Sequence, residues 1–439
     1  MRYFAVITLS AVLATAGVSL AEDAVPAAGD DKPATSESFF DLSTLASRET
    51  LTQNWFGLGE TIEERGIAVA LGLTQVYQNV LSGPTRHRRA DSHTGSYDLD
   101  IEIDPARLTG LEFLSGGTIY IGAEGSWGVG IDGTSIGSIF GANGDAGGDR
   151  FMDVRQFWYE QKLFGGKMRV RAGKMDISGG FECKGAPVGF DGNAFANDET
   201  AQFLNAALCN NPTIPFPDLG MGLALYVEPF DGIYFAAGVS DAQADARETG
   251  FNTAFHYEDW FVSFFETGIV TEFKSAKGPL AGAYRIGMWY NGQPMAKVNG
   301  NGEFMRDKVG AYLSFDQVLC KENSGEEDTQ GLGVFFRYGL SDSDVGNPKA
   351  FYSVGVQYQG LIPARDDDVL GVGWATGARS RQSGAAGITG DESVIEAYYN
   401  IQVTPWMNFG PSIQYISNPG GTAAANDTTV LGFRMQLSF

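Results

Sequence analysis

The last nine residues of the chain, 431–439, constrain its fold most strongly. Large apolar residues alternate there with small or polar residues, and the chain stops at Phe439. A period of two predicts a β-strand with one apolar face and one polar face. Such a strand can belong to a soluble sheet, or it can close an outer-membrane barrel by pairing with the first strand, so that no edge remains. A terminal phenylalanine is typical of such barrels, and we expect the barrel-assembly machinery to recognise it.

The opposite end of the chain carries an export signal. Met1-Arg2 precedes an apolar stretch at 4–18, and Ala21 completes a small-residue cleavage motif. Residues 1–21 are therefore predicted to be a secretory signal peptide, because the apolar stretch is shorter than the ~20 residues of a membrane-spanning helix. Residues 22–50, which are rich in small and polar residues, are predicted to be a flexible periplasmic leader. Export favours a barrel over a soluble secreted β-protein.

The composition fits a barrel and excludes some partners. The 59 glycines and the aromatic content of 12% are compatible with membrane strands that carry aromatic girdles. The net charge of −23 argues against nucleic acid as a partner, because phosphate groups would be repelled. No closely spaced set of His, Cys and carboxylate residues predicts a metal site, and we expect no cofactor.

Sixteen segments after Ile67 alternate between apolar and polar residues, each near the ~10 residues that a tilted membrane strand needs. The clearest segment is 97–104, in which every acidic residue lies on one face. An all-carboxylate face suits a water-filled lumen better than a soluble core. The segments lie near 68–80, 96–104, 117–128, 153–164, 166–177, 219–228, 231–240, 260–273, 280–292, 307–319, 330–341, 349–360, 367–379, 391–404, 405–417 and 428–439.

The connections between these segments alternate between short and long. Tight turns are predicted at 164–166, 229–232 and 404–405, whereas the longest connection spans 178–218. Residues 67–439 are therefore predicted to form an all-β, transmembrane, antiparallel up-and-down barrel of about 16 strands. A long loop without strands of its own is usually functional, so we expect 178–218 to be the third outer loop, folded into the pore as a constriction.

Residues 51–66 are predicted to form an N-terminal helix at the periplasmic mouth. Leu51, Trp55, Leu58 and Ile62 follow helical spacing, and Gly66 is a plausible helix end. Two interior glycines weaken the helix in isolation, so it should need a surface on which to dock. An irregular linker is the alternative.

Six different short motifs occur in order along the mature chain. Together they resemble those of the carbohydrate-selective porins of the outer membrane, the OprB family. The resemblance implies a sixteen-stranded barrel that passes sugars passively. The motifs are Leu51-Thr52-Gln53-Asn54-Trp55-Phe56-Gly57-Leu58 with Glu64-Arg65-Gly66-Ile67, Arg171-Ala172-Gly173-Lys174-Met175-Asp176, Phe203-Leu204-Asn205, Tyr284-Arg285-Ile286-Gly287-Met288-Trp289-Tyr290-Asn291, Tyr358-Gln359-Gly360-Leu361-Ile362-Pro363 with Arg365-Asp366-Asp367-Asp368, and Tyr399-Asn400-Ile401-Gln402-Val403-Thr404-Pro405-Trp406.

Charged residues on two strands are the candidate solute contacts. Because a lipid-facing arginine at the membrane midplane costs ~2–4 kcal/mol, the face that carries Lys167, Arg169 and Arg171 should point into the lumen. Facing acidic and basic walls would create a transverse field that orients dipolar solutes. Alternatively, these charges only brace the wall. The candidate pore residues are Arg169, Arg171, Asp98, Asp100, Glu102, Arg155 and Arg285. Lys174 falls on the lipid face unless a bulge intervenes.

The long loop supplies further candidates. Cys183 and Cys209 both lie in it, and an exported protein could bridge them; three unpaired thiols are the alternative. Cys320 is predicted to be free in a periplasmic turn. The polar residues proposed to line the constriction are Asp191, Asn193, Asp198, Glu199 and Asn205.

The sequence predicts a passive outer-membrane channel for small carbohydrates. A general or anion-favouring porin is the first alternative, and an outer-membrane hydrolase is a remote one. A hydrolase would have to use His87, His93 or His256, all of which are predicted to lie in outer loops. Membrane lipid and lipopolysaccharide are the expected surroundings, and the assembly is predicted to be a monomer or a homotrimer.

Overall fold

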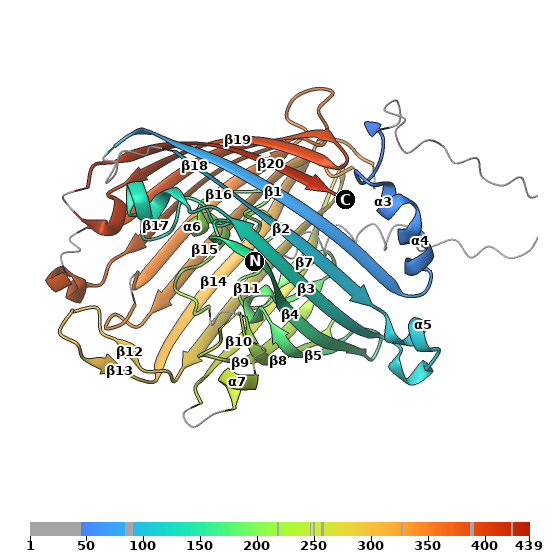
Figure 1. Cartoon of the computed structure of the whole chain (residues 1–439), viewed down its shortest axis with the longest axis horizontal. Helices are drawn as coiled ribbons and strands as arrows, with labels where there is room; N and C mark the ends of the chain where they lie inside the picture. Colours follow the sequence, from blue (N-terminus) through green and yellow to red (C-terminus); the bar gives the residue numbers. More distant parts are fainter. Residues whose placement is uncertain are drawn as a thin grey trace, which may run out of the picture.

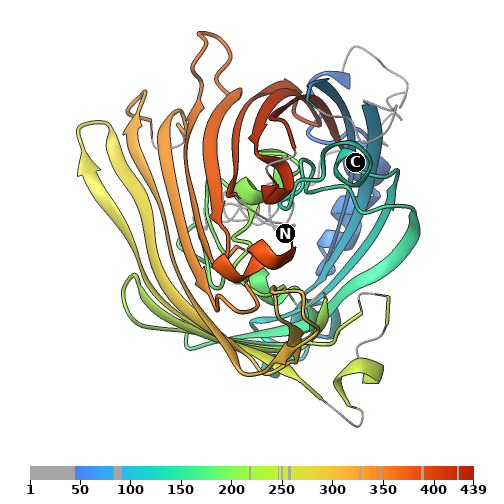
Figure 2. The same ribbon diagram turned by 90° about the vertical axis from the view of Figure 1, so that its left-hand side faces the viewer.

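A computed structural model describes residues 45–439, apart from 84–90, 217–218, 246, 249–250, 256–258, 326–327, 347, 387–389 and 423–424. Within this part of the chain, sixteen antiparallel strands form one closed barrel. Figure 2 shows how the strands surround the lumen. The first strand pairs with the last, from Gly72 opposite Ser438 to Ser82 opposite Thr429. The sixteen-stranded barrel predicted from the alternating segments is confirmed. The predicted signal peptide, and the leader up to residue 44, lie outside the described residues.

The barrel strands follow the order of the chain. They are β1 (Ile67–Ser82), β2 (Asp91–Ile103), β3 (Gly117–Trp127), β4 (Arg150–Leu163), β5 (Met168–Met175), β8 (Gly220–Phe230), β9 (Ile233–Asp241), β10 (Phe261–Ser275), β11 (Gly278–Asn291), β14 (Lys308–Lys321), β15 (Gly331–Ser341), β16 (Ala350–Gln359), β17 (Val369–Ala378), β18 (Glu392–Thr404), β19 (Met407–Ser417) and β20 (Thr428–Ser438).

The other described elements are short. Among the described residues, no helix is long and apolar enough to cross a membrane. These elements are α3 (Gln53–Phe56), α4 (Leu58–Glu63), α5 (Pro105–Thr109), η1 (Glu112–Leu114), η2 (Asp132–Ile136), η3 (Ile177–Gly179), β6 (Phe181–Cys183), β7 (Ala186–Val188), α6 (Ala206–Cys209), α7 (Phe251–Ala254), β12 (Met295–Ala296), β13 (Phe304–Met305), η4 (Arg381–Ala386) and η5 (Pro419–Gly421).

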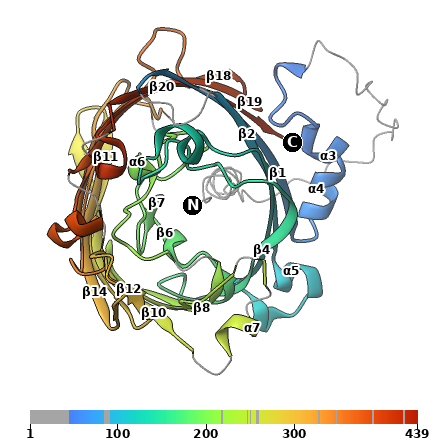
Figure 3. The same cartoon turned by 60° about the vertical axis from the view of Figure 1, so that its left-hand side comes forward.

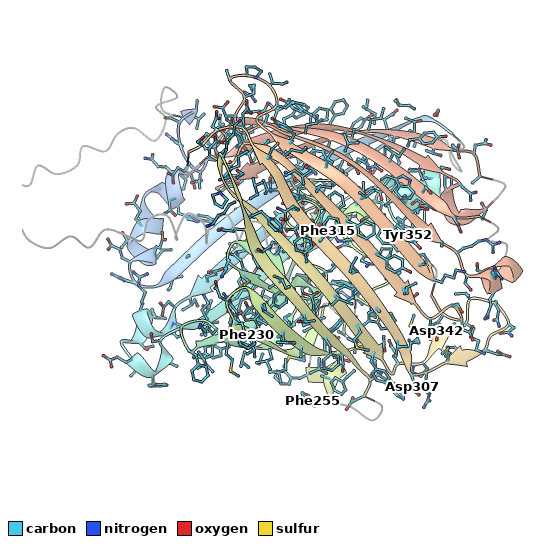
Figure 4. All side chains as sticks on the ribbon, turned by 180° about the vertical axis from the view of Figure 1, so that it is seen from behind. Phe230, Phe255, Asp307, Phe315, Asp342 and Tyr352 are labelled. Atoms are coloured by element: carbon cyan, nitrogen blue, oxygen red, sulfur yellow. The ribbon has the colours of Figure 1, made fainter. Side chains whose placement is uncertain are left out.

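The two faces of each strand differ in the way that the alternating sequence predicts. In β10, Phe261, Phe265 and Ile269 are exposed on the outer surface, whereas Val262, Phe264 and Glu266 point inward and are buried. Outward aromatic rings also pack across strands: the ring of Phe315 lies 5.8 Å from that of Tyr284 and 5.6 Å from that of Phe336. Figure 4 shows Phe315 on this outer surface. The apolar exterior is the surface that a lipid environment requires.

The two ends of the barrel are unlike each other. One end carries tight turns together with α3, α4 and the C-terminus, and the other carries the long loops (Figure 1). We call them the short-turn end and the long-loop end. At the turn between β4 and β5, Phe164, Gly165 and Gly166 have φ values of 53°, 67° and 85°. Two glycines make this reversal possible, because only glycine adopts a left-handed backbone without strain.

The prediction of one continuous helix over 51–66 is wrong. The segment consists of α3 and α4, separated by Gly57 at φ 81°. The residues of α3, Gln53–Phe56, have φ values between 52° and 62°, so this turn is left-handed. The glycine interrupts the right-handed pattern that the apolar spacing indicates.

Two long loops turn back into the barrel at the long-loop end. One is the predicted constriction loop 178–218, which contains β6, β7 and α6, and the other is 128–149, which contains η2. Figure 3 shows these green and teal segments inside the ring of strands. The constriction loop adds apolar side chains to both of two clusters that pack against inward residues of the wall, and the loop 128–149 adds side chains to the second of them. The two loops therefore occupy part of the lumen.

Candidate functional site

Two buried glutamates on the barrel wall hold the constriction loop by its backbone. Glu266 of β10 accepts hydrogen bonds from the amides of Gly189 and Phe190, at 2.6 and 2.9 Å. Glu396 of β18 accepts from the amides of Leu204 and Asn205, both at 2.8 Å. Hydrogen bonds to a charged group contribute ~1.5–3 kcal/mol each, so these two carboxylates fix the loop at two places.

Four arginines on the wall bind carbonyl groups of the same loop. These bonds join Arg171 to Gly180 at 2.9 Å, Arg285 to Pro187 at 3.0 Å, Arg337 to Leu208 at 3.0 Å, and Arg434 to Glu199 and Gln202 at 2.9 and 3.0 Å. Arg285 also pairs with Asp316 at 2.7 Å. The inward arginines of these strands therefore position the loop.

The predicted contact residue Arg171 is enclosed on every side. Its guanidinium pairs with Glu160 at 2.7 Å and lies 4.3 Å from the ring of Trp158 and 4.8 Å from that of Phe181. Only 6% of the residue is exposed. A solute could reach Arg171 only after the loop had moved, and the same holds for Arg285, which is 2% exposed. Arg169 is partly exposed, and its guanidinium lies 5.5 Å from the ring of Tyr226.

The loop 128–149 forms the second part of the infolded structure. Gln78 and Gln414, on β1 and β19, both donate to the carbonyl of Ala142 at 2.8 Å. Within the lumen this loop pairs with the constriction loop, because Gly144 N donates to Leu204 O at 2.8 Å and Ala206 N donates to Gly141 O at 3.0 Å. The two loops thus form one unit.

Sequence reasoning missed this second loop. Its signal was a set of large apolar residues in a segment predicted to face water. Ile131, Ile136 and Phe140 are all buried in the structure. Apolar residues at such a density in an outer loop indicate that the loop packs against something.

A pocket lies between the two loops and the wall formed by β2, β3 and β4. We call it the β2–β4 passage. The predicted residues Asp98 and Asp100 line it, and so does Glu199 from the constriction loop. Its charged lining is Asp98, Asp100, Glu124, Asp145, Asp176, Glu199, Arg150 and Arg155. Six carboxyl groups against two guanidinium groups make the lining acidic.

A bulge in β4 directs the predicted residue Arg155 into this passage. The register between β3 and β4 shifts at Gly122 and Ala123, so that Gln156 and Val154 pair with adjacent residues and Arg155 is left over. The Arg155 guanidinium pairs with Glu124 at 3.1 Å. Nearby, Tyr120 donates to Asp100 at 2.5 Å. Arg155 thus presents a donor within an acidic wall.

The other predicted residues lie close to the passage or inside the loop. Glu102 lies beyond Asp100 on the same face of β2, toward the short-turn end. Asn193 donates to Phe315 O at 3.3 Å, and Asn205 donates to Gln414 at 3.1 Å. Asp198 accepts from Thr200 N at 2.7 Å. These loop residues brace the loop and its contact with the wall.

Asp191 joins the two limbs of the constriction loop. Its carboxylate lies 3.2 Å from the guanidinium of Arg337 and accepts from Asn211 N at 2.7 Å. Burial raises the pKa of Asp191 to about 6, although Arg337 and the Asn211 amide oppose this shift. Burial likewise raises the pKa of Asp132, in the second loop, to about 6.

The predicted disulfide between Cys183 and Cys209 is wrong, because both thiols are free and buried. The two cysteines belong to different apolar clusters. Phe181, two residues before Cys183, packs on Tyr226 of β8 at 5.6 Å, whereas the Cys209 thiol donates to Phe203 O at 3.0 Å within the other cluster. A disulfide requires Cα atoms within ~7 Å of each other. Cys183 and Cys209 instead pack against different parts of the wall, although one loop carries both. Cys320, predicted in a turn, is exposed near the end of β14.

Two further expectations are settled by position. Lys174, near the end of β5, is 6% exposed and donates to the carbonyls of Val154 and Glu248 at 3.0 and 2.6 Å, so its ammonium is kept away from lipid. His93 lies in β2 and not in a loop as predicted. His87 and His256 are outside the described residues. No group of three His, Cys, Asp or Glu residues that could hold a metal ion occurs in the described part of the chain.

Comparison with known proteins identifies the family. The family model "Carbohydrate-selective porin, OprB family" matches residues 88–439. The chain belongs to this family. Porin B of Pseudomonas aeruginosa is 22% identical over 317 residues, which cover 65% of this chain and 68% of that protein. The putative porin QuiX of Acinetobacter baylyi is 25% identical over 181 residues, which cover 36% and 41%.

The fold agrees with this assignment. The high-pH structure of Pseudomonas putida OprB matches with a TM-score of 0.75 and 19% identity, covering 90% of this chain and 100% of that one. The low-pH structure of the same protein matches with a TM-score of 0.58 and 18% identity. The chain is thus an outer-membrane porin for carbohydrates, as its motifs predicted, and a channel rather than a hydrolase.

Proposed function

We propose that small neutral carbohydrates cross this porin through the β2–β4 passage. The observation that carries this proposal is the division of the lumen. Residues of β1, β5, β10, β11, β14, β15, β18, β19 and β20 bind the two infolded loops. β2 and β3 bind the loop 128–149 only near their long-loop ends, through Thr94, Ser96 and Ser126, and the charged residues farther along β2, β3 and β4 line the remaining cavity.

The chemistry of the passage suits a hydroxyl-rich solute. Carboxylates such as Asp98 accept hydrogen bonds from sugar hydroxyl groups, and the Arg155 guanidinium donates them. Phe216, which is 43% exposed, adds an apolar surface to the same cavity. Exchange of hydrogen bonds with water keeps affinity modest, and passive flux requires a solute that can leave.

The charge of the lining favours neutral solutes and cations over anions. Six carboxyl groups minus two guanidinium groups leave a charge of −4 when all of them are ionised. This excess speaks against the anion-favouring porin, which was inferred from the basic face of β5. Arg171 on that face is instead enclosed by Glu160 and the loop.

The test combines ion selectivity with sugar flux in reconstituted membranes. In a potassium chloride gradient the zero-current potential should show preference for K⁺, most strongly below ~0.1 M salt, where the Debye length exceeds ~10 Å. In swelling assays a neutral hexose should enter liposomes faster than the uronic acid of the same size. Preference for Cl⁻ together with faster entry of the uronate would refute the proposal.

Replacing Arg155 tests the passage itself. Arg155→Ala removes a donor and changes the lining charge from −4 to −5, so we expect weaker current block by a hexose and a further shift toward K⁺. Arg107→Ala is the matched control, because Arg107 is exposed in α5 outside the cavity lining. Equal behaviour of the two variants would show that solutes take another route.

We also propose an orientation and an assembly. The long-loop end would face lipopolysaccharide and the short-turn end the periplasm, and the assembly machinery would recognise the strand that ends at Phe439. One chain supplies the whole lining of the passage, so both a monomer and a homotrimer would be functional. Mass measurement of the detergent-extracted porin distinguishes these two states.

A further inference from the structure

The seam between the first and last strands is incomplete at the short-turn end. β2 pairs with β1 as far as Ile67, whereas β20 pairs with β1 only from Gly72 onward. The backbone of 67–71 therefore has a neighbour strand on one side only. At its boundary, Phe439 N donates to Leu71 O at 3.0 Å. Unpaired strand edges are avoided in membrane barrels, since backbone groups there have no water to bind.

Residues 45–57, which we call the seam segment, lie across this gap. The Trp55 indole N–H donates to the carbonyl of Val69 at 3.0 Å, on the uncovered stretch of β1. Leu51 N donates to Ser438 O at 2.8 Å, on the last residue of β20. Figures 1 and 3 show α3, within this segment, beside β1 and the C-terminus.

A third contact reaches the strand pair on the other side of the seam. The Trp406 indole N–H, in the turn between β18 and β19, donates to Leu45 O at 2.8 Å. Trp406 also accepts at its carbonyl from Ser438 N at 2.9 Å. The seam segment therefore binds β1, the end of β20 and the β18–β19 turn, which are the three elements that meet at the gap.

The backbone of the seam segment supports a docked role. Four consecutive non-glycine residues, Gln53–Phe56, adopt left-handed φ values. Such a conformation is unfavourable for residues that carry a Cβ atom, and it persists where surrounding contacts hold it. The hydroxyls of Thr50 and Thr52 accept from Asn54 N and Trp55 N at 2.8 and 3.1 Å, which positions the indole.

We propose that the seam segment is a latch that keeps the β1–β20 seam closed at the short-turn end. It completes hydrogen bonds that the stagger of the barrel leaves open, and it ties the first strand to the last. Because these contacts lie outside the β2–β4 passage, the latch acts on the stability of the barrel and not on sugar selection. Its test is therefore independent of the proposed route of sugars.

The first test removes one latch bond. Trp55→Phe keeps the ring but loses the N–H donor, and should lower the temperature at which the porin opens on a denaturing gel by ~2–4 °C. Trp374→Phe, on the outer face of β17, is the matched control and should change it less. Sugar swelling rates should stay the same in both variants. An unchanged opening temperature for Trp55→Phe would count against the latch.

The second test strengthens the latch. Leu51→Cys with Ser438→Cys, in a Cys320→Ser background, places two thiols at backbone positions already joined by a hydrogen bond. The bridge should form during oxidative refolding and raise the opening temperature, and a reducing agent should reverse the effect. Failure of the bridge to form would contradict the placement of the segment. A bridge that forms without raising the opening temperature would contradict the latch.

Discussion

Glu396→Gln tests how firmly the constriction loop is held. Glu396 is fully buried and accepts from Leu204 N and Asn205 N, both at 2.8 Å. Glutamine has the same shape, but its single amide oxygen can accept only one of these bonds well, and its NH₂ group faces the second amide. Two charge-assisted bonds, each worth ~1.5–3 kcal/mol, are thereby weakened.

The net effect is smaller than this sum. A neutral glutamine loses less free energy than a carboxylate when it is buried, so we expect the docked loop to lose ~1–3 kcal/mol, which corresponds to a ~5–150-fold shift toward undocked states. Undocking near 204–205 also breaks the pairing with the second loop, because Gly144 N donates to Leu204 O. Both halves of the infolded unit should therefore loosen together.

Single-channel recording in planar bilayers measures this change. The variant should show larger conductance, more current noise and faster entry of solutes larger than a hexose. Glu112→Gln, at an exposed position in η1, is the control and should match the wild type. Wild-type conductance and size discrimination in Glu396→Gln would refute the reasoning that wall carboxylates set the width of the passage.

Three further predictions concern Asp191, the three cysteines and Phe439. The pKa of Asp191 in the folded loop is about 6, above its ordinary value of 3.8, so the docked loop takes up the proton more readily than the undocked loop. Loop docking should therefore strengthen as pH falls from about 6 to 3.8. Current noise should fall over this window, and Asp191→Asn should flatten the change. Thiol labelling of denatured, unreduced protein should find three cysteines, whereas the folded porin should react at Cys320 alone; detection of one cysteine after denaturation would restore the disulfide. Deletion of Phe439 removes the bond to Leu71 O and should lower the yield in the outer membrane without blocking export, as fractionation and immunoblotting would measure.

The strands were predictable because apolar and polar residues alternate along each of them. Alternation along 97–104 and 431–439 indicates which face contacts lipid. A charged residue on the lipid face would be destabilising, so the pattern holds along each membrane strand. A soluble protein offers weaker constraints of this kind. The closed topology then follows from even spacing and from the need to leave no edge.

The contents of the lumen were less predictable, because inward charges can serve water, solute or another part of the chain. Alternation placed Arg171 and Arg285 inward correctly, but it could not show that a loop backbone would enclose them. The bulge that turns Arg155 into the passage depends on register between two strands, and the sequence does not state register. The disulfide prediction is wrong for a similar reason, because two cysteines in the same loop need not lie against the same part of the wall.

Modification of an introduced cysteine tests whether sugars cross the porin through the β2–β4 passage. In a Cys320→Ser background, Asp100→Cys places a thiol in the β2–β4 passage, and Ser353→Cys places one on β16, on the inward face at a fully buried position. Hexose flux is measured before and after treatment with a bulky thiol reagent, and mass spectrometry confirms modification at position 100. Flux should stop in Asp100→Cys and continue in Ser353→Cys. Undiminished flux through fully modified Asp100→Cys, or loss of flux in Ser353→Cys, would contradict this route.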